Sequence, residues 1–202
     1  MTPETNGEHM TKRILIILGH PAHERQSFCE ALAAAYRDAA VQAGHDVTLI
    51  KIADLKFDPV LHEGYQGNQP PEPDIADAQE TVRRAEHLVI VYPMWEYMMP
   101  ALLKGFFERT FTPGFAYALK SRNPRRNGLL GGKSVRLIQT TGMATIMYRL
   151  FFMAHGAKAF KDMLRFCGIA PVRITYFGMI EGSDRRRKRY LEKARALGRS
   201  GL

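Results

Sequence analysis

Five short apolar runs recur along the chain, and the stretches between them carry apolar residues at helical spacing. The run 88–92 is uninterrupted and rich in β-branched residues, the pattern of a parallel strand that is covered on both faces. We expect strands at 13–18, 47–52, 88–92, 133–139 and 172–177. Strands that alternate with helices predict a three-layer α/β/α domain, and right-handed crossovers favour the order 2-1-3-4-5 in one five-stranded parallel sheet.

Capping signals and apolar spacing predict the helices. Ser27 and Glu30 form a capping box at the start of a helix that runs to Gly44. Ser183 is expected to cap the last helix, and Gly198 is expected to end it. Further helical patterns cover 75–85 and, at least in part, 145–168.

The length of 202 residues, 46% of them hydrophobic, suits one well-buried α/β domain and is too short for two. We expect this domain at 12–202, after a disordered segment at 1–11 that shows no periodicity. The irregular stretches 53–73 and 111–132 are long enough to be functional or interface loops. The longest apolar runs are strand-sized and the first residues lack a signal-peptide pattern, so we expect a cytoplasmic protein without a membrane span.

The segment 91–117 joins the third strand to an aromatic loop, a helix and a second aromatic loop. Pro93 ends the strand, and Trp95 and Tyr97 precede Pro100, which suits the first position of a helix. Ligands bind at the carboxyl ends of parallel strands where the winding reverses, so this aromatic loop is expected to hold a flat ring. The alternative is that Trp95 and Tyr97 are ordinary core or dimer-contact aromatics. The buried stripe of the helix is expected to be Leu102, Leu103, Phe106 and Phe107.

Three stretches follow one family pattern in the right order along the chain. They are Gly19-His20-Pro21 with Ser27-Phe28, Pro93 to Arg109 with Phe115-Ala116-Tyr117, and Thr140-Thr141-Gly142 with Met147-Tyr148 and His155. In these stretches the chain resembles the NAD(P)H dehydrogenase (quinone) family of flavodoxin-like fold, the NAD(P)H:quinone oxidoreductases and modulator-of-drug-activity-like flavoproteins. The resemblance implies hydride transfer from NAD(P)H through a bound flavin, FMN or FAD, to a quinone or similar acceptor in a ping-pong reaction.

The resemblance also implies which residues bind the flavin. His20, Ser27 and Phe28 would contact its phosphate, at the start of a helix whose free N–H groups suit an anion. Tyr148 and His155 would lie by the ring edge and stabilise or relay charge. The wall and backbone donors along the ring would come from Pro93, Met94, Trp95, Glu96, Tyr97, Thr140, Thr141 and Gly142.

The chain departs from the family pattern at several positions. Met143 stands where a second glycine is frequent, which would impair close approach of the backbone to the ring. Cys29 stands where an asparagine is common, after a loop that is two residues longer. Glu96 replaces an aromatic residue, and its carboxylate would oppose negative charge on the reduced flavin unless Arg109 or another cation neutralises it.

The formal net charge of +9 is concentrated at 120–136 and 181–202. Arginines in the first segment predict a preference for NADPH, because Arg122, Arg125 or Arg126 could hold its 2′-phosphate. The alternative is that these arginines are solvated or contact another protein. The second segment begins an amphipathic helix whose basic face we expect to be solvated, so no nucleic-acid partner is predicted.

The remaining expectations concern cysteines and partners. Cys29 and Cys167 are expected to be buried, and no metal site is predicted because neither lies in a C-x-x-C motif. The Met and aromatic residues of the edge loops predict a homodimer with its interface beside the flavin. The competing function is a partner-binding module, such as a flavin-binding ancillary subunit of a potassium efflux system, which would dock a peripheral membrane-protein partner.

Overall fold

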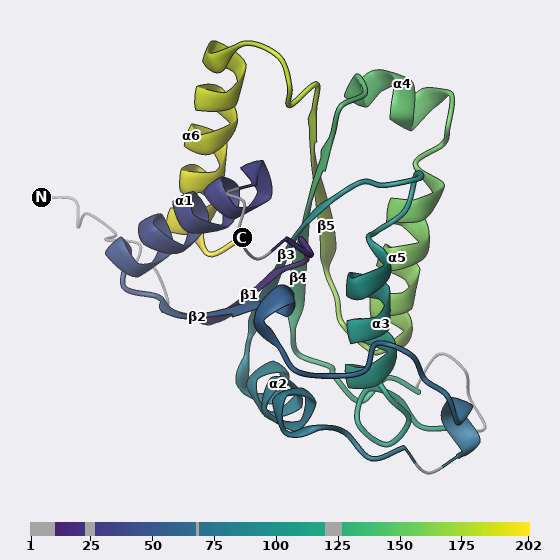
Figure 1. The fold of residues 1–202 in the computed structure, drawn as a ribbon. Helices are drawn as coiled ribbons and strands as arrows, with labels where there is room; N and C mark the ends of the chain where they lie inside the picture. The colour runs from purple at the N-terminus through teal and green to yellow at the C-terminus, as the bar shows by residue number, and fades with distance from the viewer. Residues whose placement is uncertain (1–10, 23–26, 68, 120–126) are drawn as a thin grey trace, which may run out of the picture.

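The computed structural model describes residues 11–22, 27–67, 69–119 and 127–202, and these form a doubly wound α/β fold around one parallel sheet (Figure 1). The strand order is β2-β1-β3-β4-β5, as the sequence predicts, and all four neighbouring pairs are parallel. The strands are β1 Arg13–Leu18, β2 Asp46–Lys51, β3 His87–Pro93, β4 Ser134–Thr141 and β5 Val172–Gly178.

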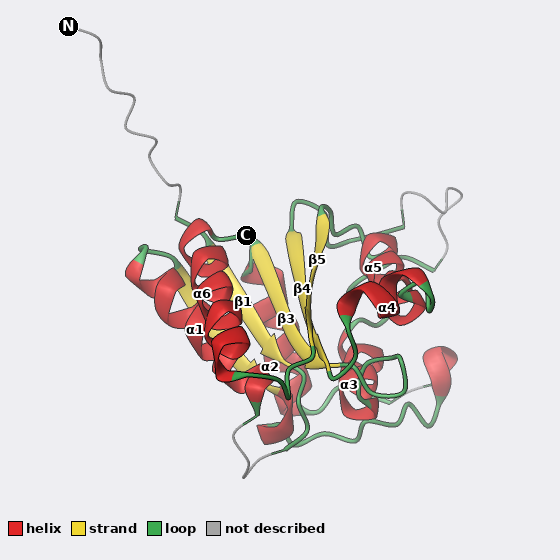
Figure 2. Cartoon of the chain, turned by 90° about the horizontal axis from the view of Figure 1, so that it is seen from above, coloured by secondary structure: helices red, strands yellow, loops and turns green. Residues whose placement is uncertain are grey.

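Helices cover both faces of this sheet (Figures 1 and 2). They are α1 Phe28–Gln42, α2 Pro73–Arg84, α3 Ala101–Thr110, α4 Thr145–Leu150, α5 His155–Phe166 and α6 Asp184–Ser200. Helices α1 and α6 pack on one face, and α2, α3 and α5 pack on the other. Two short 3-10 helices, η1 Ile52–Asp54 and η2 Gly64–Gln66, lie in the loop that follows β2. In the described residues, no helix is both long and apolar enough to span a membrane.

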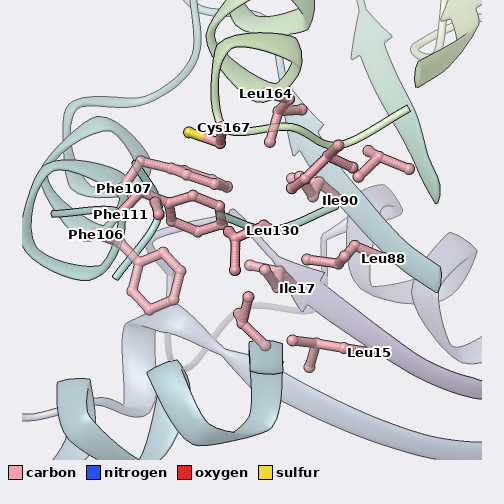
Figure 3. Close-up of a cluster of buried hydrophobic side chains, with 14 of the residues drawn as sticks. Leu15, Ile17, Leu88, Ile90, Phe106, Phe107, Phe111, Leu130, Leu164 and Cys167 are labelled. Atoms are coloured by element: carbon pink, nitrogen blue, oxygen red, sulfur yellow. The ribbon is translucent and has the colours of Figure 1, made fainter. Parts of the chain in front are cut away.

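Alternate residues of the central strands enter two separate cores. Leu15, Ile17, Leu88 and Ile90 lie against an aromatic group from α3 and the residue after it, Phe106, Phe107 and Phe111 (Figure 3). Ile14, Ile16, Val89 and Val91 point the other way, toward α1 and α6. The uninterrupted apolar runs therefore reflect burial on both faces, as expected for parallel strands.

Several predicted boundaries are wrong, each for a local reason. Strand β4 includes Thr140 and Thr141, because both continue the register with β5 up to Gly178. The helical segment 145–168 is split into α4 and α5 by Met153 and Ala154, which have φ of 51° and 48°.

The end of the last helix is also misplaced in the prediction. Gly198 lies inside α6, and Gly201 ends the helix in the left-handed conformation with a φ of 59°. A Cβ on Gly198 would lie 2.2 Å from the carbonyl oxygen of Tyr36 in α1. The residue is glycine because two helices meet there, and not because a helix ends.

The capping box at the start of α1 is half formed. The Ser27 hydroxyl accepts a hydrogen bond from the Glu30 amide at 3.1 Å, as predicted. The Glu30 carboxylate instead pairs with Lys51 Nζ at 2.5 Å, at the end of β2. The segment 1–11, apart from Thr11, and the arginines 122, 125 and 126 lie outside the described residues.

Candidate active site

Three loops come together at the carboxyl edge of the sheet, where β1, β3 and β4 end. The register pairs Leu18 with Val91 and Pro93 with Thr140, so the strands end side by side. The winding reverses between β1 and β3, which is where an open parallel sheet binds ligands. The loops 19–22, 94–99 and 142–144 therefore form the candidate site.

The loop after β3 folds into a tight hairpin that the sequence did not predict. Trp95 and Met98 exchange two backbone hydrogen bonds, of 3.0 and 2.8 Å. Between them, Glu96 and Tyr97 have φ of 46° and 64°, the left-handed conformation that a type I′ turn requires. Such backbone costs about 1–3 kcal/mol per residue when the residue is not glycine, and it concentrates at ligand sites. No described backbone acceptor takes the N–H groups of Glu96 and Tyr97.

Residues of β4, α4 and α5 hold this hairpin in place. The Met94 N–H donates to the Thr140 carbonyl at 2.7 Å, which ties the start of the loop to β4. The Tyr148 hydroxyl donates to the Tyr97 carbonyl and accepts from the Ala157 N–H, both at 3.4 Å. The Tyr97 carbonyl can approach α5 this closely because residue 156 is glycine. A Cβ at this position would lie 2.1 Å from the Tyr97 carbonyl oxygen.

Aromatic side chains line the open side of the edge. Trp95 is 47% exposed and Tyr97 is 44% exposed, although both are large and apolar. The His20 ring meets the edge of Trp95 with centroids 5.8 Å apart, and Tyr97 lies 4.7 Å from Phe152. These rings offer an apolar surface to a planar ligand. His20 also accepts a hydrogen bond from the Ala22 N–H through Nδ1, at 3.1 Å.

The end of β4 provides open space beside the hairpin. A Cβ built on Gly142 meets no atom within 4 Å, and Gly142 does not have a positive φ. Neither the backbone conformation nor a close neighbouring atom therefore requires glycine at position 142. The Met143 N–H donates to Thr141 Oγ1 at 3.1 Å, and the partly buried Met143 side chain packs inward against the cluster around Tyr148. The expected effect of Met143 on close approach of the backbone to the ring stays a prediction.

The start of α1 adds an anion-binding element. No described acceptor takes the N–H groups of Phe28 and Cys29, which belong to the first turn of a 15-residue helix. From α6, the Arg187 guanidinium lies 4.9 Å above the Phe28 ring. Beneath them the buried Cys29 thiol lies 3.2 Å from Thr140 Oγ1. Burial raises the pKa of Cys29 to about 12, so the thiol is neutral at pH 7 and is no nucleophile.

The two predicted catalytic residues occupy different environments. Tyr148 is fully buried, and its hydroxyl is committed to the hairpin and to α5. His155 is exposed at the first residue of α5. No hydrogen bond joins the two side chains in the described structure.

Arg109 does not neutralise Glu96. Its side chain is 2% exposed and pairs with Glu72 at 2.8 Å, and it also donates to the Pro70 carbonyl at 3.1 Å. Arg109 therefore stabilises the long loop after β2, and its guanidinium is not available to neutralise Glu96. Glu96 is exposed at the tip of the hairpin. Among the residues that the structure describes, no three His, Cys, Asp or Glu side chains are grouped to hold a metal ion.

Sequence reasoning missed three parts of this site. They are the strained Trp95–Met98 hairpin, Gly156 in contact with the Tyr97 carbonyl, and Arg187 stacked on the Phe28 ring. The Asn-Gly or Asp-Gly pair that usually indicates a type I′ turn is absent. Gly156 follows His155 directly and stands alone in a helical pattern, which is the one available signal of a close approach. The contact of Arg187 joins segments far apart in the sequence and leaves no local signal.

Comparison with known proteins gives consistent results. A family model described as flavodoxin-like fold matches residues 12–199. An uncharacterized NAD(P)H oxidoreductase of Haemophilus influenzae is 32% identical over 187 residues, which cover 89% of this chain and 91% of that protein. NAD(P)H dehydrogenase (quinone) 1 of Cavia porcellus is 34% identical over 164 residues, covering 69% of this chain and 56% of the relative. This chain thus matches a little over half of the Cavia enzyme's length.

Solved structures share the same architecture. Smu.1420 from Streptococcus mutans superposes with a TM-score of 0.78 at 30% identity, covering 93% of this chain and 98% of that one. An NAD(P)H:quinone oxidoreductase from Methanothermobacter marburgensis gives a TM-score of 0.77 at 23% identity, covering 94% and 96%. The second likeness concerns the fold alone.

Proposed function

We propose, from the premise that this chain belongs to the family of proteins with a flavodoxin-like fold, that it is a flavin-dependent NAD(P)H dehydrogenase with a quinone-like acceptor. Relatives named as NAD(P)H oxidoreductase and NAD(P)H dehydrogenase (quinone) support the reaction class. The flavin is FMN or FAD. The proposed setting is the cytoplasm, where NAD(P)H is available.

One observation carries the proposal: the strained Trp95–Met98 hairpin beside an open Gly142. The N–H groups of Glu96 and Tyr97, which have no described backbone acceptor, are donors of the kind that the pyrimidine edge of a flavin accepts. The open space at Gly142 leaves room for the ring edge. Strained backbone of this kind concentrates at ligand sites, which supports the assignment.

The residues present fit a flavin at each of its parts. The N–H groups of Phe28 and Cys29, which have no acceptor among the described residues, would hold the phosphate at the start of α1. Trp95 would provide an apolar wall, with His20 against its edge. When bound, the flavin accepts hydride from NAD(P)H and passes electrons to the acceptor, the two substrates binding in turn.

The two predicted catalytic residues then have different roles. Tyr148 is a positioning residue, because its hydroxyl holds the Tyr97 carbonyl and so aims the hairpin donors. His155, exposed at the start of α5, can exchange a proton with solvent and with a group at the ring edge. These proposed roles differ from the charge relay that the family resemblance implies, which stays a prediction.

The test of the proposal is the visible spectrum of the purified protein. The protein is incubated with FMN or FAD, freed of excess flavin by gel filtration, and titrated with NADPH without oxygen. We expect a bound-flavin band that NADPH bleaches and that a benzoquinone restores. A protein that retains no flavin would contradict the proposal, and a flavin that neither NADPH nor NADH bleaches would favour the partner-binding alternative.

We further propose that the protein is a homodimer. Several apolar side chains near the candidate site are exposed, including Phe151 at 80% and Ile146 at 69%. Beside the hairpin, an apolar pocket of about 270 Å³ lies between α3 and α5, with Met98 at its rim. A monomer leaves these surfaces in water. Light scattering at micromolar concentration, with flavin bound, should give the mass of two chains, and the mass of one chain would refute the dimer.

A further inference from the structure

An open groove runs along the outer side of the sheet, between β5 and the helices α4 and α5. Its volume is about 570 Å³. No residue of the three loops at the candidate active site lines it. Strand β5 is at the sheet edge beside these helices (Figure 2). We call this feature the basic groove, and it is lined by Arg149, Lys158, Lys161, Arg173, Leu150 and Met153, among others.

The charge of the basic groove is of one sign. Four cationic side chains line it, and no Asp or Glu does. Across the described residues no ion pair engages Lys158, Lys161 or Arg173, whereas the nearby Arg165 is paired with Asp162 at 3.7 Å. Unpaired cations around one concavity produce a positive potential that attracts an anionic partner.

Apolar surface lies between these cations. Leu150 is 65% exposed and Met153 is 48% exposed, and both line the groove. The Tyr176 ring also contributes, with the Arg149 guanidinium 6.0 Å from its centroid. A partner that carries charge alone would leave this apolar surface unused, so the fitting partner has apolar side chains as well.

The third feature is the free edge of β5. This strand pairs with β4 on one side, and no strand of the described chain pairs with the other side. An edge strand leaves every second pair of N–H and C=O groups available to another chain. Extended peptides bind such edges by strand addition, with alternate side chains entering neighbouring pockets.

We propose that the basic groove docks an extended, acidic segment of a partner protein, which adds as a strand to the edge of β5. The backbone edge supplies main-chain hydrogen bonds, the cations select carboxylates, and Leu150 and Met153 receive apolar side chains. A nucleic acid or an anionic bilayer would satisfy the charge but would use neither the strand edge nor the concave apolar floor. Docking is independent of flavin, because the groove shares no residue with the candidate active site.

The test uses fluorescence anisotropy with a labelled peptide of about eight residues, a typical strand length, in which glutamate alternates with valine. Either the glutamate or the valine side chains can face the groove, because a one-residue shift of the strand register exchanges the two sets. Two further peptides serve as controls: one has lysine in place of glutamate, and the other is N-methylated at every residue, which removes the N–H donors from both of its edges. The protein is the full chain with whatever flavin it retains.

The matched variants are Lys158→Glu with Lys161→Glu in the groove, and Arg185→Glu with Lys188→Glu on α6. Both doubles change the charge equally, and α6 packs on the opposite face of the sheet. We expect the acidic peptide to bind wild type at least about tenfold more tightly than the groove double, while the α6 double stays within about twofold of wild type. Circular dichroism and flavin retention establish that both doubles are folded.

Three results would overturn the proposal. Equal loss of affinity in both doubles would mean attraction by net charge alone. Undiminished binding of the N-methylated peptide would exclude strand addition. Binding of vesicles that contain phosphatidylserine, or of a DNA oligonucleotide, without binding of the acidic peptide would assign the groove to another class of partner.

Discussion

Individual residues of this chain are fixed by what approaches their backbone, and glycines mark the closest approaches. Gly156 and Gly198 are required by the protein itself, since a Cβ at either would lie within 2.2 Å of a neighbouring carbonyl oxygen. Gly142 is different, because the space beside it is open. At the carboxyl edge of the sheet, this open space leaves room for a ligand.

Replacement of Gly142 by valine should therefore empty the flavin site without harming the fold. Gly131→Val is the matched control, because Gly131 also has open space and no positive φ, but precedes the opposite end of β4. We expect flavin affinity to fall at least about tenfold in Gly142→Val, or about 1.4 kcal/mol, and to stay unchanged in Gly131→Val. Equilibrium dialysis gives the affinities, and wild-type affinity in Gly142→Val would remove Gly142 from the site.

Tyr148→Phe separates a positioning role from a proton-transfer role. The variant loses the hydroxyl that joins the Tyr97 carbonyl to the Ala157 N–H, and one neutral hydrogen bond contributes about 0.5–1.5 kcal/mol. We expect weaker flavin binding by several-fold and an unchanged shape of the kcat–pH profile.

The control for Tyr148→Phe is Tyr176→Phe, which removes a hydroxyl from the ring that lies 5.9 Å away. It should leave flavin affinity near that of wild type. A changed kcat–pH profile in Tyr148→Phe, with normal flavin affinity, would restore the catalytic role that the family resemblance implies.

At the scale of elements, the close packing of α1 on α6 depends on one position. Alanine at 198 should stabilise an isolated helix by about 1 kcal/mol relative to glycine. Here its Cβ would lie 2.2 Å from the Tyr36 carbonyl oxygen and 3.2 Å from the Ala40 nitrogen, so the helices must separate. We expect Gly198→Ala to destabilise the protein by about 1–3 kcal/mol, the usual cost of overpacking.

Urea denaturation measures whether Gly198→Ala lowers or raises the free energy of unfolding. Ala196→Gly, on the exposed side of the same helix, provides the reverse control and should cost about 1 kcal/mol from helix propensity alone. Stabilisation of the protein by Gly198→Ala would show that the two helices adjust without strain.

The whole molecule carries a built-in sensitivity to acid through His87, at the start of the central strand β3. This side chain is 1% exposed, and its Nδ1 lies 2.7 Å from Ser134 Oγ. Burial, followed by the nearby cations Lys12, Arg136 and Arg173, lowers the pKa of His87 to about 3. The unfolded chain takes up a proton near pH 6.5, so stability is lost as the pH falls below 6.5 and until the folded protein also protonates.

We expect the free energy of unfolding to fall by roughly 3 kcal/mol between pH 6.5 and pH 4 through this residue, at about 1.4 kcal/mol per pH unit. His87→Gln should flatten that part of the profile, whatever its effect on stability at pH 7. Urea denaturation across the pH range measures the slopes, and equal slopes for wild type and His87→Gln would contradict the assignment.

The sequence by itself determined the sheet, its order and the edge at which the site lies. Strands covered on both faces are mostly apolar, so Arg13–Leu18 was identified residue for residue and the other strands to within two residues. Right-handed crossovers then leave few topologies. The positions of the edge loops follow from where the strands end.

Only the tertiary structure decided what each side chain does at that edge. The left-handed backbone at Glu96 and Tyr97 is imposed by Tyr148 and Gly156 from other elements, and no local propensity indicates it. Arg109 pairs with Glu72 instead of Glu96 because the loop after β2 folds back over α3. Gly198 lies within a helix because another helix meets it there. Such choices depend on contacts between distant segments, whereas the apolar pattern of a strand depends on burial alone.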